Sequence, residues 1–444
     1  MENRLKTCWN PVRSLLAHTL CVASLSVAPA AASATTPDAP ELAGPGPHAV
    51  GLRHIDVPSD GGSSSPLKGL LWYPAVPAPA TPPSALQWAP RTHPWRPWAS
   101  AKTRLEVASQ AVAHAAPAPT GASSSRWPVV VLSHGLLSWA EMFNYLGEHL
   151  ASRGYVVLAV QHDDDAHAEP LKAALARRPT QQLAALRALE RLDQQPADPL
   201  KDRLDIQRCA LVGYSMGAYG ALVAAGARIA PDGAAFGYGG AQAMGEHSQP
   251  MHQADQAVSS RVAAVVALAP WGGQAAFGAF KPAGLAGVTA PTLLVGGDQD
   301  DISGYADGVR GIWEGLARSE RHLLTYENAR HNIAQRGAPG GTPDNFRAWE
   351  SFEEPVWRRE RLMDLNRHFI TAFLDRHVKG DLGRDKWLTV ATPRSNDGTW
   401  PVPYGTPNHG EFAGAPREGL SYWPGFQRRW ALGMRLEQLK ARRD

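Results

Sequence analysis

The stretch CALVGYSMG at residues 209–217, followed by AYGALVAAGA at residues 218–227, decides the fold. Residues 209–212 are an apolar run typical of a buried strand, and residues 218–227 have the small apolar side chains of a helix. Between them, Gly213 and Gly217 flank Ser215 in the pattern Gly-x-Ser-x-Gly, which at a strand-to-helix turn exposes the serine hydroxyl on a strained backbone. A glycine-rich turn with an incidental serine is the alternative, and the flanking strand and helix favour the first interpretation.

On both sides of this stretch, short apolar runs alternate with helical periodicity. This pattern predicts the α/β class, with a mostly parallel, doubly wound sheet covered by helices on both faces. An antiparallel hairpin, His48–Val57 and Leu67–Tyr73, opens the domain. The predicted parallel strands are Val129–Leu132, Tyr155–Val160, Cys209–Val212, Ala263–Ala269, Thr292–Val295 and His322–Tyr326. The predicted helices are Thr103–His114, Met142–Ser152, Thr180–Gln194, Ala218–Ala227 and Arg361–His377. In such sheets ligands bind at the carboxyl ends of the strands, so we expect the site there.

A serine hydroxyl is a poor nucleophile until a base takes its proton, so a histidine oriented by a carboxylate should follow in the sequence. Three carboxylates follow the predicted strand 292–295, namely Asp298, Asp300 and Asp301. The loop after the next predicted strand carries His331, which we take as the base. A histidine with a surface or capping role is the alternative.

Such chemistry also needs backbone donors for an oxyanion. The N–H of Met216, directly after Ser215, is the first candidate. The loop Ser133–Leu137 follows an early strand, and its bend makes the N–H of Leu136 the second candidate donor. We expect His134 in this loop to fix the loop by hydrogen bonding.

Several motifs resemble those of secreted α/β-hydrolases of the dienelactone hydrolase-like group. They are LWYP at residues 71–74, VLSHG at 131–135, LASRGYVV at 150–157, the turn at Ser215, and the loops of Asp300 and His331. That group is similar to platelet-activating factor acetylhydrolases and to cutinases and polyester hydrolases. The resemblance covers about residues 48–381 and implies the α/β-hydrolase fold, with Asp300 as the acid and Asp298 as the fallback. Dienelactone hydrolases proper use a cysteine nucleophile, so their lactone substrate is not implied.

The chain divides into four predicted parts. Residues 1–34 have the basic start, short apolar stretch and small-residue end of a signal peptide, which predicts export to the periplasm or beyond the cell. Residues 35–47 form a linker, and residues 48–385 form the hydrolase domain, with insertions near 74–127 and 226–260. We expect the second insertion to overhang the pocket and both insertions to set substrate size. Residues 386–444 form an extension whose Trp423, Phe426 and Trp430 are predicted to pack on the core.

The composition limits the partners. Lys and Arg number 44 against 41 Asp and Glu, so the net charge of +3 argues against nucleic-acid binding. Outside residues 1–34 the single cysteine is Cys209, which leaves no internal disulfide, and no apolar window is long enough for stable membrane insertion. The expected partner is a small-molecule or polymeric ester, and no cofactor is expected.

Two clusters resemble metal-ligand sets. His162 to His167 combines two histidines with three carboxylates, although a solvated acidic loop is the commoner reading. Met244, His247, Met251 and His252 would suit copper, although a lid rich in small residues accounts for them too. We assign no metal to either cluster.

The sequence therefore predicts an exported serine hydrolase that cleaves carboxylic esters through an acyl-enzyme intermediate. A non-catalytic or metal-binding module on the same scaffold is one alternative, because fold alone does not fix function. An acyltransferase or peptidase with the same three residues is another.

Overall fold

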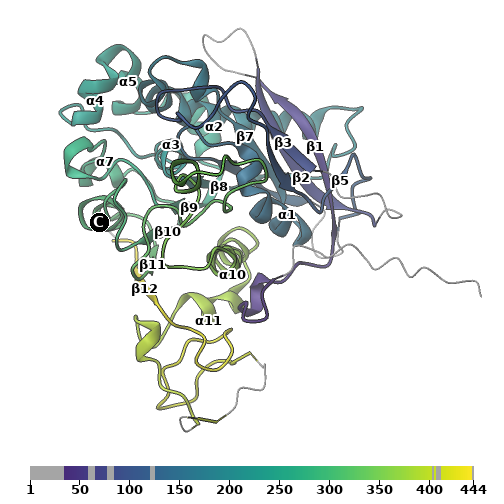
Figure 1. The fold of residues 1–444 in the computed structure, drawn as a ribbon, viewed down its shortest axis with the longest axis vertical. Helices are drawn as coiled ribbons and strands as arrows, with labels where there is room; N and C mark the ends of the chain where they lie inside the picture. Colours follow the sequence, from purple (N-terminus) through teal and green to yellow (C-terminus); the bar gives the residue numbers. More distant parts are fainter. Residues whose placement is uncertain are drawn as a thin grey trace, which may run out of the picture. The chain divides into compact units, whose positions relative to one another are not determined.

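A single large sheet carries the loops of interest. The computed structural model describes residues 35–58, 66–77, 85–120, 126–402, 405–406 and 412–442. Within these residues, ten strands form a mixed sheet in the order β12-β11-β10-β9-β8-β6-β7-β2-β1-β5 (Figure 1). The predicted signal peptide and most of the predicted turn 58–66 lie outside the described residues.

All eight predicted strands are present in the sheet, although β8 begins five residues before its predicted start, and β5 and β12 are strands that were not predicted. Their bounds are β1 Ala49–Val57, β2 Leu67–Ala75, β5 Val112–Ala113, β6 Trp127–Ser133, β7 Val156–Gln161, β8 Leu204–Tyr214, β9 Val262–Leu268, β10 Thr292–Gly297, β11 Arg321–Tyr326 and β12 Met434–Leu439. Strands β6 to β11 pair in parallel. Strands β1 and β2 form the antiparallel hairpin. The predicted α/β fold with an antiparallel opening hairpin is confirmed.

Helices cover both faces of this sheet. Their bounds are α1 Asn144–Ser152, α2 Pro170–Gln194, α3 Met216–Ala224, α4 Ala234–Gly239, α5 Ala241–Ser248, α6 Gln253–Ser259, α7 Pro282–Leu285, α8 Gly311–Gly315, α9 Phe346–Trp349, α10 Arg359–His377 and α11 Asp385–Leu388. In β6, Val130 and Leu132 pack in the core with α1 and α10, whereas Val129 and Val131 pack in the core with α2 and α3. Apolar residues at the four consecutive positions 129–132 thus bury both faces of the strand.

The predicted helix Thr103–His114 is wrong. Residues Leu105–Ala108 form β4, which pairs with β3 (Ala85–Trp88), and Val112–Ala113 form β5. Along β4 buried and exposed residues alternate, because Leu105 and Val107 point inward and Glu106 points outward. That period of two fits a strand and not a helix.

Helix α2 begins ten residues before the predicted start at Thr180 and runs through Pro179. An interior proline has no N–H for the carbonyl four residues earlier, which normally breaks a helix. Here that carbonyl belongs to Leu175, and it accepts a hydrogen bond of 2.9 Å from the hydroxyl of Tyr219 in α3. A tertiary contact therefore replaces the missing helix bond.

Both ends of the described chain pack against the core. In the predicted linker, Thr36 Oγ1 donates to Asp364 and the N–H of Leu42 donates to His368, so this segment lies on α10. After α11 the chain returns to the sheet as β12, antiparallel to β11 (Figure 1). Trp423 and Phe426 lie in the core as predicted, whereas Trp430 is 45% exposed, contrary to the prediction.

In the described part of the chain, none of the helices combines the length and the apolar character that a bilayer crossing requires.

Candidate active site

Ser215 lies in the sharp turn between β8 and α3. Its backbone angles are φ 54° and ψ −115°, a region that costs a residue with a side chain roughly 1–3 kcal/mol. A Cβ on Gly213 would lie 2.3 Å from the carbonyl of Gly217, and one on Gly217 would lie 2.1 Å from the carbonyl oxygen of Ser133. Both glycines are therefore required by close backbone contacts, as a nucleophile elbow needs.

The side chains of Ser215, His331 and Asp300 form a continuous set of hydrogen bonds. His331 Nε2 lies 3.1 Å from Ser215 Oγ, and His331 Nδ1 lies 2.9 Å from Asp300 Oδ2. The side chain of Asp300 is completely buried and that of His331 is 11% exposed. The fold thus brings together three residues that are separated by 116 and 31 positions in the sequence.

The surroundings of Asp300 keep its carboxylate charged. Burial acts to raise its pKa, but the adjacent His331 and backbone N–H groups outweigh burial and hold the pKa below its usual value. Oδ1 accepts hydrogen bonds of 3.0 Å from the N–H of Ile302 and 2.8 Å from the N–H of Ser303. A carboxylate fixed in this way accepts the Nδ1 proton of His331 and leaves Nε2 free to accept a proton from Ser215.

The other two carboxylates of this loop have different partners. Asp298 Oδ1 accepts a 2.7 Å hydrogen bond from the N–H of Asn328. Asp301 forms an ion pair with Arg330. The sequence offered these three carboxylates as candidates for the acid, and Asp300 is the one that is hydrogen-bonded to His331.

Tyr214 is a site residue that the sequence analysis missed. Its ring lies 5.2 Å from the ring of His331, and its hydroxyl lies 3.3 Å from the backbone carbonyl of His331. The second position of the Gly-x-Ser-x-Gly motif thus supports the histidine across the turn. In the sequence, the aromatic side chain next to Ser215 was the feature that could have indicated this role.

The loop Ser133–Leu137 lies beside Ser215, and Leu136 lines the same cavity as Ser215. Burial and the nearby Arg178 lower the pKa of His134 to about 3, so its ring is neutral. Its Nδ1 donates to the carbonyl of Gly135 at 2.7 Å, and its Nε2 accepts from the N–H of His162 at 3.0 Å. His134 fixes the loop, as predicted. Met216, whose N–H is the other candidate donor, is the first residue of α3 and directly follows Ser215.

A cavity of about 260 Å³ opens at Ser215 and His331. Its walls include Trp95 and Trp98 from the first predicted insertion, Trp139, and Phe352. Trp98 is fixed by a 3.0 Å hydrogen bond from its Nε1 to Ser351 Oγ, which ties the first insertion to the segment before α10. The residues of this segment were not predicted as site residues, because they lie in an irregular stretch with no recognisable motif.

A second cavity of about 370 Å³ adjoins the first, and the two share Ile302, His331, Asn332 and Ser351. Two aromatic side chains of α9 line it: Phe346 is 71% exposed and Trp349 is 48% exposed. Their ring centroids are 6.1 Å apart. We call these two residues the aromatic shelf.

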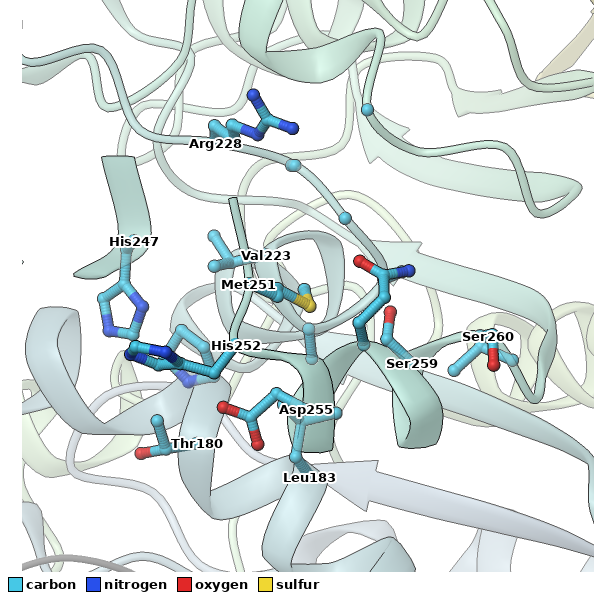
Figure 2. Close-up of a pocket in the computed structure, with 18 of the residues that line it drawn as sticks. Thr180, Leu183, Val223, Arg228, His247, Met251, His252, Asp255, Ser259 and Ser260 are labelled. Atoms are coloured by element: carbon cyan, nitrogen blue, oxygen red, sulfur yellow. The ribbon is translucent and has the colours of Figure 1, made fainter. Parts of the chain in front are cut away.

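The second predicted insertion does not overhang this pocket. Among the described residues that line the cavity at Ser215, none comes from 226–260. Helices α4, α5 and α6 pack on α2, and α6 and its neighbours line a separate cavity of about 280 Å³ (Figure 2). In Figure 2, Met251, His252 and Asp255 of the insertion lie near Thr180 and Leu183 of α2. This insertion therefore packs on α2 and does not line the cavity at Ser215.

The two clusters that resemble metal sites are engaged in other contacts. His162 uses both ring nitrogens, at 2.8 Å from Ser133 Oγ and 2.5 Å from Gln181 Oε1. His247 Nε2 donates to the carbonyl of Ala176 at 2.7 Å, and Met244 is buried in an apolar cluster. In the part of the chain that the structure describes, no group of three or more His, Cys, Asp and Glu side chains is arranged to hold a metal ion.

Buried neutral histidines predict a loss of stability in acid. Burial is the main cause that lowers the pKa of His134, His322 and His368 to about 3, and nearby arginines contribute at His134 and His368. Between pH 6.5 and 3 the unfolded chain binds these protons and the folded chain does not, so each group costs about 1.4 kcal/mol of folding free energy per pH unit as the pH falls.

His322 provides the test, because neither of its ring nitrogens has a hydrogen-bond partner among the described residues. In urea unfolding at pH 7 and pH 4.5, His322→Phe should lose less stability on acidification than the wild type. An equal loss of stability in the variant and the wild type would refute the claim that buried His322 stays neutral.

Comparison with known proteins agrees with the predicted family resemblance and fold. Residues 93–235, which include Ser215, match the family described as PET hydrolase-like. The bis(hydroxyethyl) terephthalate hydrolase of Streptomyces coelicolor is 26% identical over 214 residues, 48% of this chain and 53% of that protein. Cutinase 1 of Thermobifida cellulosilytica and the cutinase of Thermobifida fusca are each 24% identical over 214 residues, 47% of this chain. These stretches cover 62% and 54% of the two cutinases, so the chain spans little more than half the length of the curated relatives it matches. The predicted resemblance to α/β-hydrolases related to cutinases and polyester hydrolases is confirmed.

Proposed function

We propose that this protein is a serine hydrolase that cleaves carboxylic esters. The observation that carries the proposal is the hydrogen-bonded set Ser215, His331 and Asp300, of which Ser215 and His331 line an accessible cavity. The similarity to cutinases and to a terephthalate ester hydrolase supports the same class of reaction.

In the first half of the reaction, Ser215 Oγ attacks the acyl carbon while His331 Nε2 takes the hydroxyl proton. Asp300 stabilises the imidazolium through Nδ1. The N–H groups of Leu136 and Met216 donate to the oxyanion of the tetrahedral intermediate. When the intermediate collapses, the bond to the alcohol oxygen breaks, His331 returns its proton to that oxygen, and the acyl group remains on Ser215.

In the second half, a water molecule takes the place of the alcohol. His331 accepts a proton from the water as its oxygen attacks the acyl carbon, and the bond to Ser215 Oγ then breaks. The proton passes from His331 to Ser215 Oγ, which regenerates the hydroxyl and releases the carboxylic acid.

A fluorophosphonate probe tests the proposal, because it reacts with an activated serine. Purified protein should be labelled at Ser215, and hydrolysis of p-nitrophenyl acetate should fall in proportion to the label. Labelling of a different residue, or full activity in fully labelled protein, would overturn the assignment.

The substrate is proposed to be an ester with aromatic or other apolar groups on both sides of the bond that is cleaved. Trp98, Trp139 and Phe352 give the cavity at Ser215 apolar walls, and the shared residues Ile302 and His331 connect it to the aromatic shelf. Aromatic diesters that carry further aromatic groups on their alcohol side, such as bis(benzoyloxyethyl) terephthalate, fit this description.

Replacing Trp349 with alanine should weaken the binding of long substrates only. We expect KM for the three-ring ester bis(benzoyloxyethyl) terephthalate to rise about three- to tenfold, since one aromatic contact contributes about 1 kcal/mol. KM for p-nitrophenyl acetate should stay within about twofold of the wild-type value, because this small ester does not reach the shelf. Trp430→Ala is the matched control, because Trp430 is similarly exposed and lines neither cavity. Equal changes in KM for the two esters would refute the role of the shelf.

We also propose that the protein is exported, on the basis of the predicted signal peptide. The amino-terminal sequence of protein recovered from periplasm and medium should begin near Thr35. Recovery of protein that begins at Met1 in the cytoplasm alone would contradict export.

A further inference from the structure

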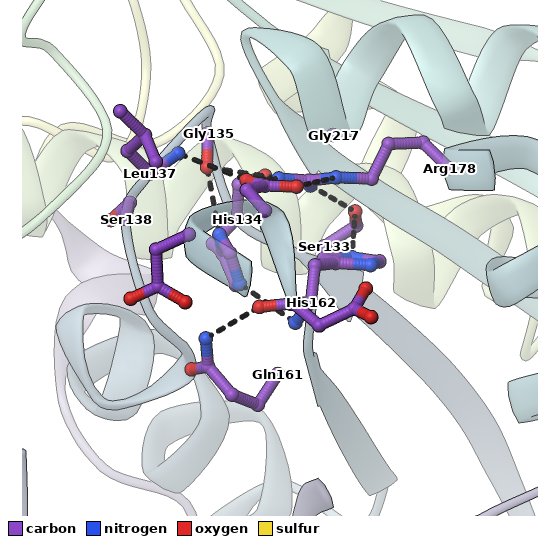
Figure 3. Close-up of polar contacts among 12 residues, drawn as sticks. Ser133, His134, Gly135, Leu137, Ser138, Gln161, His162, Arg178 and Gly217 are labelled. Atoms are coloured by element: carbon purple, nitrogen blue, oxygen red, sulfur yellow. Dashed lines mark hydrogen bonds and ion pairs between the residues drawn. The ribbon is translucent and has the colours of Figure 1, made fainter. Parts of the chain in front are cut away.

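The buried face of helix α2 contacts both segments that supply the proposed oxyanion donors. We propose that Arg178, Asp164 and Gln182 are positioning residues that hold these two segments at a fixed separation. The inference rests on the proposed function and concerns how the oxyanion hole is kept in shape. Figure 3 shows Arg178 reaching the loop of Ser133, His134 and Gly135, with Gly217 close by.

Arg178 holds the loop through its backbone carbonyls. Its Nη1 donates to the carbonyl of His134 at 2.5 Å, and its Nη2 lies 3.2 Å from the carbonyl of Gly135. The guanidinium is planar and rigid, so these bonds fix both the position and the tilt of the peptide that precedes Leu136.

Asp164 holds the same loop from its other end. One of its oxygens, Oδ2, lies 2.5 Å from Arg178 Nη2 and accepts a 2.9 Å hydrogen bond from the N–H of Leu137. The peptide of Leu136 is thus enclosed between a carbonyl bound by Arg178 and an N–H bound by Asp164. This arrangement restricts rotation of the N–H of Leu136 away from Ser215.

Gln182 contacts the second segment. It lies one helical turn after Arg178 on the same face of α2, and its Nε2 donates to the carbonyl of Gly217 at 2.9 Å. Gly217 follows Met216, whose N–H is the other proposed donor. The two helices can approach this closely because Gly220 has no side chain: a Cβ there would lie 2.4 Å from Gln182 Nε2 and 2.9 Å from Arg178 Cβ.

Burial argues that the ion pair has a role beyond stability. The side chain of Arg178 is 0% exposed and that of Asp164 is 5% exposed. Removing two charges from water costs about as much as their attraction returns, so a buried pair is a poor source of net stability. The hydrogen bonds of this pair go largely to the loop carrying Leu136, which supports a positioning role.

The test compares variants of two equally buried ion pairs. Asp164→Asn keeps the shape of the side chain and removes its charge. Asp364→Asn makes the same change in a second ion pair, which joins Asp364 to Arg367 in α10 at 2.9 Å and lies outside the site. The side chain of Asp364 is 2% exposed and that of Arg367 is 5% exposed. Gln182→Leu is a milder variant that removes one hydrogen bond and keeps the ion pair, and it serves if Asp164→Asn does not fold.

We expect kcat for p-nitrophenyl acetate to fall about 10- to 100-fold in Asp164→Asn, with KM within about threefold of the wild-type value, because oxyanion contacts strengthen in the transition state. Gln182→Leu should lower kcat about five- to tenfold. A trifluoromethyl ketone, which forms a tetrahedral adduct with a serine, should lose affinity by the same factors. Asp364→Asn should keep wild-type kcat and ketone affinity in its folded fraction, as measured by circular dichroism.

Wild-type kcat and ketone affinity in folded Asp164→Asn or folded Gln182→Leu would overturn the inference. An equal loss of kcat in Asp364→Asn would overturn it too, because the effect would then be one of general stability. These outcomes are separate from a failure of the proposed function, which would appear as full activity in a protein that lacks the hydroxyl of Ser215.

Discussion

Replacing Ser215 with alanine is expected to lower kcat for short p-nitrophenyl esters by about 10⁶-fold, the size of loss found on removing the nucleophile of a comparable serine triad. The hydroxyl is the atom that forms and breaks the acyl bond, and an alanine methyl group cannot replace it. The fold should survive, since among the described residues the side chain of Ser215 is hydrogen-bonded only to His331.

The measurement is the steady-state hydrolysis of p-nitrophenyl acetate and butyrate, together with thermal unfolding of both proteins. Ser319→Ala is the matched control, because Ser319 is fully buried and hydrogen-bonded to the carbonyl of Ala290 at 2.7 Å, on a different part of the sheet. Its activity should equal that of the wild type. If Ser215→Ala retained most of the activity, Ser215 would not be the nucleophile.

Asp300→Asn is expected to lower kcat by about 10⁴-fold, the loss seen when the acid of a serine triad becomes an amide. Oδ1 of Asp300 accepts two backbone N–H groups, from Ile302 and Ser303, so the amide oxygen of asparagine should take that position. Its NH₂ group would then face His331 Nδ1 and donate to it. This places the imidazole proton on Nε2, where it blocks the acceptance of a proton from Ser215.

Asp298→Asn is the control for this variant. It changes a carboxylate two residues away that accepts a hydrogen bond from the N–H of Asn328. We expect its kcat to stay close to the wild-type value, because the acid that is hydrogen-bonded to His331 is Asp300. A large loss in Asp298→Asn with normal kcat in Asp300→Asn would instead identify Asp298 as the acid.

Much of the fold was predictable because its signals are local. Runs such as Val129–Leu132 and Leu293–Val295 are apolar at every position, which is typical of strands buried on both faces. The close backbone contacts at Gly213 and Gly217 leave their mark on the sequence as two glycines around Ser215. The order of strands and loops then limited the choice of acid and base to a few residues.

The parts that were missed depend on contacts between distant residues. Helix α2 continues through Pro179 because Tyr219 supplies a hydrogen bond from another helix. Trp98 and Phe352, which line the cavity at Ser215, come from irregular segments more than 250 residues apart. Local periodicity in the sequence cannot predict that two such segments meet. The second insertion was predicted at the pocket because it lies between Ser215 and Asp300 in the sequence, yet it packs on α2.

The central claim is that Ser215 carries the acyl group during turnover. Its most direct test is a rapid acid quench of the protein with p-nitrophenyl acetate, followed by proteolysis and mass spectrometry. We predict that the peptide containing Ser215 gains one acetyl group on that serine at the rate of the first turnover. Turnover that leaves Ser215 unmodified while another side chain becomes acetylated would contradict the account.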